Sequence, residues 1–219
     1  MFDVLKFIPI LLEGALITIQ ITFLSLILAL IIGLFAALAR ISNSKILNKI
    51  AGFYISVIRG TPLLVQLMYV YFVLPDLGIN LSPFSAGVIG LAIYEGAYLA
   101  EIFRAGIQSI GKGQMEAAYS IGMNNRTAMR RIILPQAFRN VIPPVGNSAI
   151  LLLKNSSLCA FIAVNELMHT AELLATSTFR NLEIFTLVAI MYWVLHYPMK
   201  QLVQYLERRM DFDSGKRYQ

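Results

Sequence analysis

Five long apolar blocks limit what this chain can fold into. Each is about 20 residues long or longer, which is the length that an α-helix needs to cross the hydrocarbon core of a bilayer. The blocks run from about Leu11 to Ala39, Ala51 to Leu74, Phe84 to Ile107, Val141 to Val164 and Glu183 to Leu206. They predict an all-α, polytopic membrane protein with about five transmembrane helices, organised as one domain over residues 1–219.

The composition agrees with a membrane environment. Of 219 residues, 58% are hydrophobic and 14% are charged, whereas soluble domains have roughly 45–50% and about 25%. The formal net charge of +6 does not indicate nucleic-acid binding, because the basic residues lie between the apolar blocks rather than in a stripe with interleaved aromatic residues. The first block is too long for a signal peptide and follows acidic residues, so we expect a retained span.

The distribution of basic residues predicts the orientation. The connections at 40–50 and 111–140 and the segment after the fifth block are rich in Lys and Arg, whereas those at 75–83 and 165–182 contain at most one. The positive-inside rule then puts the basic connections and the C-terminus in the cytoplasm and the N-terminus outside. The connection at 165–182 is amphipathic, which predicts a short helix near the outer face.

The basic connection at 111–140 contains signals for two short helices. Gly122 suits the left-handed conformation that ends a helix, and Asn124 or Asn125 is suited to cap the next one. The second helix is expected to continue until Pro135 kinks or stops it. Taken alone, this pattern also fits an amphipathic hairpin that lies on the membrane surface.

A spaced motif lies within the same connection. It consists of Glu116-Ala117-Ala118, Gly122 three residues beyond Tyr119, and Ile133-Leu134-Pro135. This motif resembles the EAA loop in permease subunits of ATP-binding-cassette (ABC) importers. The resemblance implies a type I ABC importer permease fold, in which this loop docks in a groove of the ATPase subunit and transmits its movement to the spans. The contact would involve Glu116, Ala117, Ala118 and Gly122.

Further motifs lie between Ile55 and Leu158. They are Arg59-Gly60-Thr61-Pro62, Gly96-Ala97-Tyr98 with Glu101 and Arg104, Gly113-Gln114, Pro135-Gln136, and Lys154 with Ser156-Ser157-Leu158. Together they resemble the branch of ABC permeases that imports polar amino acids, with the histidine, arginine and glutamine permeases as the nearest likenesses.

The resemblance also implies the partners. We expect two ATPase subunits, a second permease subunit that is either an identical copy or a paralogue, and an extracytoplasmic amino acid-binding protein, all at a bacterial cell membrane. The chain lacks the Gly-x-x-x-x-Gly-Lys-Ser/Thr signature of an ATP-binding loop, so ATP is expected to bind the partner ATPases and the chain needs no cofactor of its own.

Five charged residues fall inside the apolar blocks, where a charge is costly and indicates either a functional site or a buried pair. They are Arg59, Glu95, Glu101, Arg104 and Lys154. Counting residues along the helices puts Arg59 and Glu101 at similar depth, which predicts an intramembrane ion pair. Arg104 either joins this pair or extends to the surface. The alternative is that these three residues form a substrate gate.

Polar residues near the expected midplane form a candidate substrate site, because transporter sites commonly lie there. The candidate residues are Glu95, Lys154, Tyr98, Ser156, Ser157, Thr61 and Gln66. Lys154 and the two serines offer donors to a substrate carboxylate, whereas Glu95 offers an acceptor to a cationic side chain. Glu95 therefore favours arginine, lysine or histidine over glutamine. The alternative, a Glu95–Lys154 pair, is compatible with this role if the pair opens to admit a cation.

Two other classes of protein remain as alternatives. A secondary amino acid transporter driven by an ion gradient also uses intramembrane carboxylates, but such proteins usually contain inverted repeats, which are not visible here. A membrane-embedded enzyme would need a nucleophile and a base near one face, and no such set is found.

His169 and His196 lack a second ligand at helical spacing, so no metal site is expected. We therefore expect an importer of polar, chiefly basic, amino acids with no catalytic residues; a glutamine importer of the same type is the nearest alternative.

Overall fold

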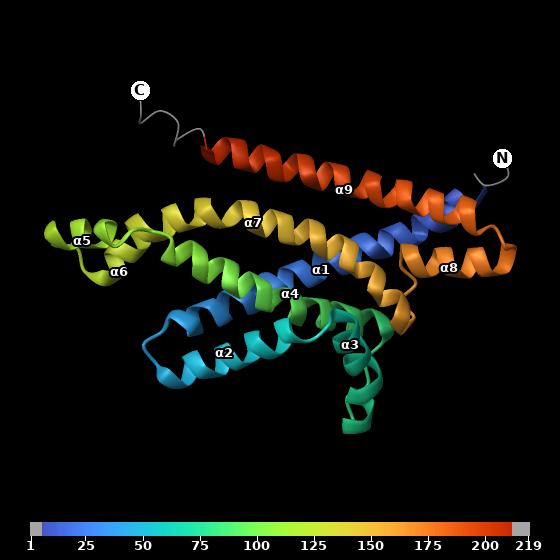
Figure 1. Ribbon diagram of the computed structural model, residues 1–219, viewed down its shortest axis with the longest axis horizontal. Helices are drawn as coiled ribbons and strands as arrows, with labels where there is room; N and C mark the ends of the chain where they lie inside the picture. The colour runs from blue at the N-terminus through green and yellow to red at the C-terminus, as the bar shows by residue number, and fades with distance from the viewer. Residues whose placement is uncertain (1–5, 212–219) are drawn as a thin grey trace.

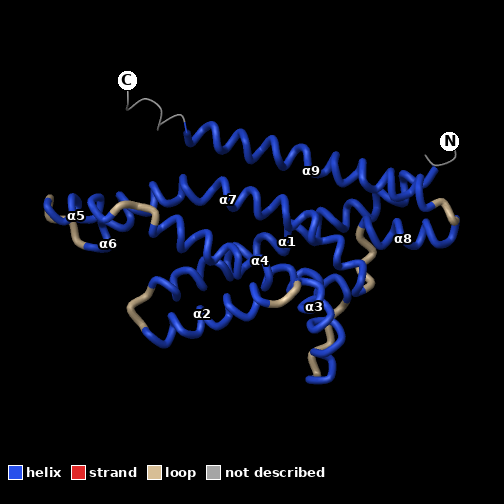
Figure 2. The backbone as a smooth tube through the Cα atoms, in the orientation of Figure 1, coloured by secondary structure: helices blue, strands red, loops and turns tan. Residues whose placement is uncertain are grey.

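The computed structural model describes residues 6–211 of the chain. Within this range every regular element is helical (Figure 2), which confirms the all-α prediction. Four helices are long and apolar enough to cross a membrane, and a bent pair of helices supplies a fifth candidate span. The five candidate spans coincide with the five apolar blocks of the sequence.

The elements follow one another with short connections. In chain order they are α1 (Ile8–Ile41), α2 (Lys45–Gly60), α3 (Leu63–Met68), the π-helix η2 (Tyr69–Val73), the 3₁₀-helix η3 (Leu74–Leu77), α4 (Pro83–Gln108), α5 (Lys112–Ser120), α6 (Asn125–Ala128), the π-helix η4 (Met129–Ile133), α7 (Leu134–Asn155), the 3₁₀-helix η5 (Ser156–Ile162), α8 (Leu167–Thr178) and α9 (Asn181–Asp211). The short helix expected between 165 and 182 is therefore present as α8.

The long helices lie side by side (Figure 1). α4 packs against α1 on one side and α7 on the other, α2 lies along α1 and α4, and α9 lies along α7. Figure 1 shows α5, α6 and the end of α9 at one end of the molecule, and the start of α1 with α8 at the opposite end. This arrangement agrees with an odd number of crossings.

Small residues allow α1 and α4 to approach closely. A Cβ atom added at Gly33 of α1 would lie 2.8 Å from the Cβ of Leu99 and 3.0 Å from the carbonyl oxygen of Gly96, and one added at Gly96 would lie 2.8 Å from Ile32. Lipid tails are as apolar as the helix surfaces, so helices associate in a bilayer largely through close packing at small residues. These glycines therefore position α4, which contributes most of the charged candidates.

A buried carboxylate joins three helices at the end of the molecule that contains α8. Glu166 caps α8 by accepting hydrogen bonds from the backbone N–H groups of Met168 and His169 at 2.9 and 2.8 Å. It also accepts from the Tyr192 hydroxyl of α9 at 2.9 Å and the Thr18 hydroxyl of α1 at 3.4 Å. Burial raises the pKa of the Glu166 carboxyl, and these four donors oppose that rise.

Pro135 does not stop the second helix of the basic connection, so of the two expected outcomes, a kink or a stop, the stop does not occur. The π-helix η4 comes directly before it, and the helix continues through Pro135 into α7. A proline normally loses one backbone hydrogen bond and its ring collides with a carbonyl one turn earlier. The proline occupies the first turn of α7, directly after the wider π turn, and we attribute the continuity of the helix to this wider turn.

Candidate functional site

The second span is broken at Gly60-Thr61-Pro62. α2 ends at Gly60, α3 begins at Leu63, and the two segments are bent by 107°. Pro62 has no N–H to continue the helix, so carbonyl groups at the end of α2 lose their usual donors. Inside a membrane each of these groups needs a partner from the protein or from a water-filled cavity.

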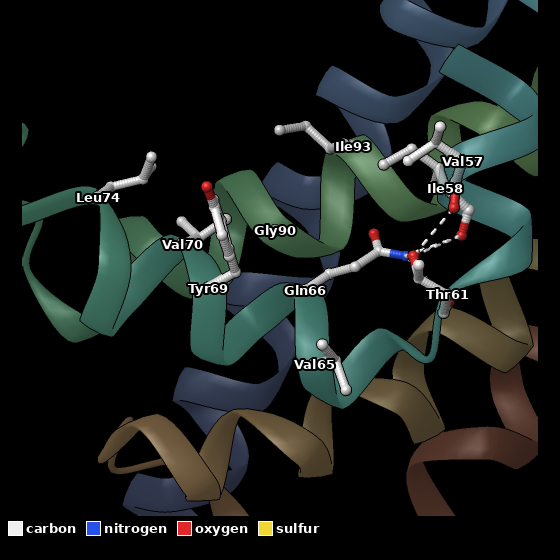
Figure 3. Close-up of a pocket in the computed structure, with 10 residues that line it drawn as sticks. All are labelled: Val57, Ile58, Thr61, Val65, Gln66, Tyr69, Val70, Leu74, Gly90 and Ile93. Carbon is white, nitrogen blue, oxygen red and sulfur yellow. Dashed lines mark hydrogen bonds between the residues drawn. The ribbon is translucent and has the colours of Figure 1, made fainter. Parts of the chain in front are cut away.

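Thr61 and Gln66 supply those partners, as Figure 3 shows. The Thr61 hydroxyl donates to the carbonyl oxygen of Val57 at 3.0 Å. The Gln66 amide nitrogen donates to the carbonyl oxygen of Ile58 at 2.8 Å and to the Thr61 hydroxyl at 2.8 Å. The Oε1 atom of Gln66 is buried and has no hydrogen-bond partner within residues 6–211. The two predicted site residues thus hold the bend together and leave one acceptor available.

A cavity of about 440 Å³ lies beside the bend. Residues of α2, α3, η2, η3 and α4 line it (Figure 3): Val57, Ile58, Thr61, Val65, Gln66, Tyr69, Val70, Leu74, Gly90 and Ile93. Small-molecule sites typically have volumes of about 300–1,000 Å³, mostly apolar walls and a few polar groups that fix orientation. The cavity fits this description, with Thr61, Gln66 and Tyr69 as its polar lining residues.

A cluster of aromatic and charged side chains lies along α4. The rings of Tyr94 and Tyr98 lie 4.9 Å apart, and their hydroxyl groups are 3.2 Å apart. The guanidinium carbon of Arg59, from α2, lies 5.1 Å from the centroid of the Tyr98 ring. Glu101 forms its ion pair with Arg104, one turn along the same helix, at 2.7 Å. Among the described residues Glu101 therefore pairs with Arg104 and not with Arg59, the partner that the sequence had suggested, because Arg59 stacks on the Tyr98 ring.

The other predicted site residues differ in burial. Glu95 is only 4% exposed, and its carboxylate interacts with the Ser148 side chain of α7. Lys154 is exposed on α7. The hydroxyl groups of Ser156 and Ser157 donate to backbone carbonyl oxygens three residues earlier, each at 2.7 Å. The side chain that interacts with Glu95 is thus Ser148, which the sequence analysis did not select.

Three exposed polar residues of α7 are spaced seven residues apart. Asn140, Asn147 and Lys154 are all exposed, and a spacing of seven places them on one side of the helix. We call this side the polar face of α7. The exposed large residues of α1 are apolar by contrast, including Phe23, Ile27 and Leu34. Within a bilayer the polar face therefore requires a partner or water, whereas this surface of α1 is suited to lipid.

The basic connection forms two short helices joined at Gly122, as the sequence predicted. Gly122 adopts a left-handed conformation with a φ of 79°, and the Asn124 side chain accepts from the backbone N–H of Thr127 at 2.9 Å. Ala118 is 1% exposed, and its carbonyl oxygen accepts from the N–H of Met123 at 3.0 Å. Glu116 and Ala117 are exposed. Ala118 and Gly122 thus form the bend, while Glu116 and Ala117 are accessible to another protein.

The bent span and the α5–α6 hairpin, which consists of the two short helices on either side of Gly122, occur in a chain whose sequence matches a known protein family. A family model for the binding-protein-dependent transport system inner membrane component matches residues 29–212. The chain belongs to this family. It is therefore a membrane transport component and not an enzyme.

Three relatives cover nearly the whole chain. The L-cystine transport system permease protein TcyB of Bacillus subtilis is 43% identical over 94% of this chain and 88% of its own length. The glutamine transport system permease protein GlnP of Escherichia coli is 41% identical, covering 93% of this chain and 94% of its own length. The arginine transport system permease protein ArtQ of Bacillus subtilis is 40% identical, covering 93% of both chains.

A solved structure has the same fold. The crystal structure of an amino acid ABC transporter with histidines contains a chain that superposes with a TM-score of 0.91 at 41% identity, covering 95% of this chain and 97% of that chain. This agreement confirms the ABC importer permease fold.

Replacing Gln66 with alanine tests how the bend is held. The Gln66→Ala variant removes the closer donor to the Ile58 carbonyl and leaves only the Thr61 hydroxyl at 3.5 Å. A buried polar group that loses its hydrogen bond costs about 1–3 kcal/mol. We expect a lower melting temperature for the purified protein than for the Gln20→Ala control, which removes an exposed glutamine from α1. Equal melting temperatures for the two variants would show that water replaces the amide.

Proposed function

We propose that this chain is the permease subunit of an ATP-driven importer of amino acids, with basic amino acids as its preferred substrates. The observation that carries the proposal is the identity of 40 to 43% with three permeases that are named for cystine, glutamine and arginine transport. Their names share the transport of amino acids and differ in the side chain. Substrate preference therefore depends on this chain's own residues.

Glu95 supports a cationic substrate. Its carboxylate is buried between α4 and α7 and interacts with a neutral partner, the Ser148 side chain. A buried carboxylate without a basic partner is costly, and a substrate guanidinium, ammonium or imidazolium would relieve that cost. Gln66 Oε1 and Thr61 line the cavity on the other side of α4 from Glu95, so they are proposed as a separate polar contact along the path and not as part of the Glu95 site. Lys154 is proposed to attract the substrate carboxylate, with Ser156 and Ser157 supporting the end of α7.

The cluster on α4 is proposed as the gate. Arg59 rests on the Tyr98 ring, where a cation is attracted to the aromatic face. A cationic substrate competes for the same face, and its arrival would displace Arg59 toward Glu101. The Glu101–Arg104 pair would then exchange partners. Movement of Arg59 would shift the end of α2 relative to α4, which is one step of alternating access.

The α5–α6 hairpin is proposed as the contact with the ATPase. Glu116 and Ala117 are exposed and are proposed to enter a groove of the ATPase subunit, while Ala118 and Gly122 fix the shape of the bend. Because the helix is continuous from Asn125 to Ile162, a displacement of the hairpin is transmitted directly into the membrane. We propose on this basis that α5 and α6 lie in the cytoplasm and the N-terminus outside.

The proposed assembly contains two permease subunits, two ATPases and an external binding protein. Each ATPase would bind one α5–α6 hairpin, and a second copy of this chain is the simplest second permease. ATP binding would close the ATPases and open the amino acid site outward, where the binding protein delivers its ligand. Hydrolysis would return the site to the cytoplasmic side.

Substrate preference is tested by replacing Glu95 with glutamine. In the purified complex with its ATPase, Glu95→Gln removes the negative charge but keeps the shape. We expect arginine affinity to fall about tenfold or more, because losing one pairing of a buried charge costs about 1.4 kcal/mol or more, while glutamine affinity stays within about twofold. Equilibrium binding to the solubilised complex, without the binding protein, measures both. An unchanged ratio of arginine to glutamine affinity would contradict the basic specificity and leave the importer assignment intact.

ATPase docking is tested by adding bulk to the exposed alanine. We expect Ala117→Trp to abolish copurification of the ATPase and amino acid uptake, because a large side chain keeps the two backbones apart. The matched control is Ala189→Trp, at an exposed alanine of α9. Retention of the ATPase by the Ala117→Trp variant would contradict the proposed contact.

A further inference from the structure

An apolar groove lies on another side of the bundle. It has a volume of about 570 Å³ and lies between α1, α4 and α7. The residues that line it are Leu30, Leu34, Phe103, Ile107, Leu134, Ala137, Phe138, Val141, Ile142 and Val145. Phe138 is 64% exposed within the described chain, and Leu34 and Leu134 are 46% and 44% exposed. The groove is thus open along one side.

The groove faces away from the polar face of α7. Each residue of an α-helix is rotated by about 100° from the previous one. On this basis Phe138, Ile142 and Val145 lie on the opposite side of α7 from Asn147 and Lys154. The groove is therefore separate from the candidate transport path.

The groove continues into the apolar surface of α1. Leu34 lines the groove and belongs to the same exposed apolar stripe as Ile27 and Leu38. An exposed apolar stripe along a membrane span is suited to lipid tails, and an apolar groove within such a stripe offers one tail more contact than a flat surface does.

Two arginines lie at the end of the groove nearest to α5 and α6. Arg130 and Arg131 are exposed in η4, about one turn before Leu134, which lines the groove. Guanidinium groups form paired hydrogen bonds with phosphate, and basic pockets between membrane helices bind anionic lipid headgroups. Apolar walls and cationic groups thus follow one another in the order that matches the tail and the headgroup of a phospholipid.

We propose that this groove binds one anionic phospholipid of the adjacent leaflet. Its acyl chain lies along Leu34, Phe138 and Val145, and its phosphate contacts Arg130 and Arg131. The bound lipid seals the gap between α1 and α7 at the base of the hairpin. The site is independent of the amino acid site and of the proposed substrate.

Fluorescence quenching by brominated lipids tests this site. The chain has a single tryptophan, Trp193, so the Trp193→Phe/Phe138→Trp variant reports on the groove alone. The full-length variant is reconstituted in mixed phosphatidylglycerol and phosphatidylcholine vesicles in which only one lipid carries brominated chains. Each basic side chain favours an anionic lipid by about fivefold. We therefore expect brominated phosphatidylglycerol to quench the introduced tryptophan with at least about fivefold higher apparent affinity than brominated phosphatidylcholine.

Two comparisons make the result specific. The Arg130→Gln/Arg131→Gln change should equalise quenching by the two lipids, whereas Arg208→Gln/Arg209→Gln, at another exposed basic pair, should leave the preference intact. A Leu34→Trp reporter in the Trp193→Phe background gives the same readout from α1 if the first reporter fails to fold. Equal quenching by both lipids in the parent variant would overturn the proposal. Absence of quenching by either lipid would also overturn it and would indicate that a second copy of the chain covers the groove.

Discussion

The need to pair every backbone polar group inside a bilayer governs this structure. Four spans meet it with unbroken helices, and the second span cannot, because Pro62 interrupts it beside Gly60. The freed carbonyl groups receive hydrogen bonds from Thr61 and Gln66. A bend of 107° is thereby stable within the membrane, and the cavity beside it exists because α3 turns away from the line of α2.

The rest of the bundle supports this bend. Close packing at Gly33 and Gly96 fixes α4 against α1, and α4 in turn forms the wall that faces the bend. Arg59, the next-to-last residue of α2, reaches the Tyr98 ring of α4. On the far side of α4, Glu95 and Ser148 link it to α7, which continues into the hairpin. One connected set of contacts therefore runs from the cavity to the surface proposed for the ATPase.

Much of this arrangement is predictable from the sequence, because hydrophobic length and turn chemistry act locally. The five spans, the left-handed Gly122 and the Asn124 cap all follow from a few neighbouring residues. Partner choice is not local. Counting residues puts Arg59 and Glu101 at similar depth, yet Arg104 is one helical turn from Glu101 and reaches it directly. Ser148 carries no charge, so nothing in the sequence distinguished it from other small residues as the partner of Glu95. The sequence left open whether Pro135 stops or kinks the helix, because a π turn such as η4 cannot be foreseen from composition.

Thiol labelling tests most directly whether the bend and the polar face of α7 form the transport path. Single cysteines at Val65, which lines the cavity, and at Asn147 are introduced into a Cys159→Ala background and treated with a membrane-impermeant maleimide. A cysteine at Leu28, on the apolar surface of α1, is the control. We expect that Val65→Cys and Asn147→Cys react, that arginine slows both reactions, and that Leu28→Cys does not react. Equal labelling at all three positions, or labelling that arginine does not change, would contradict it.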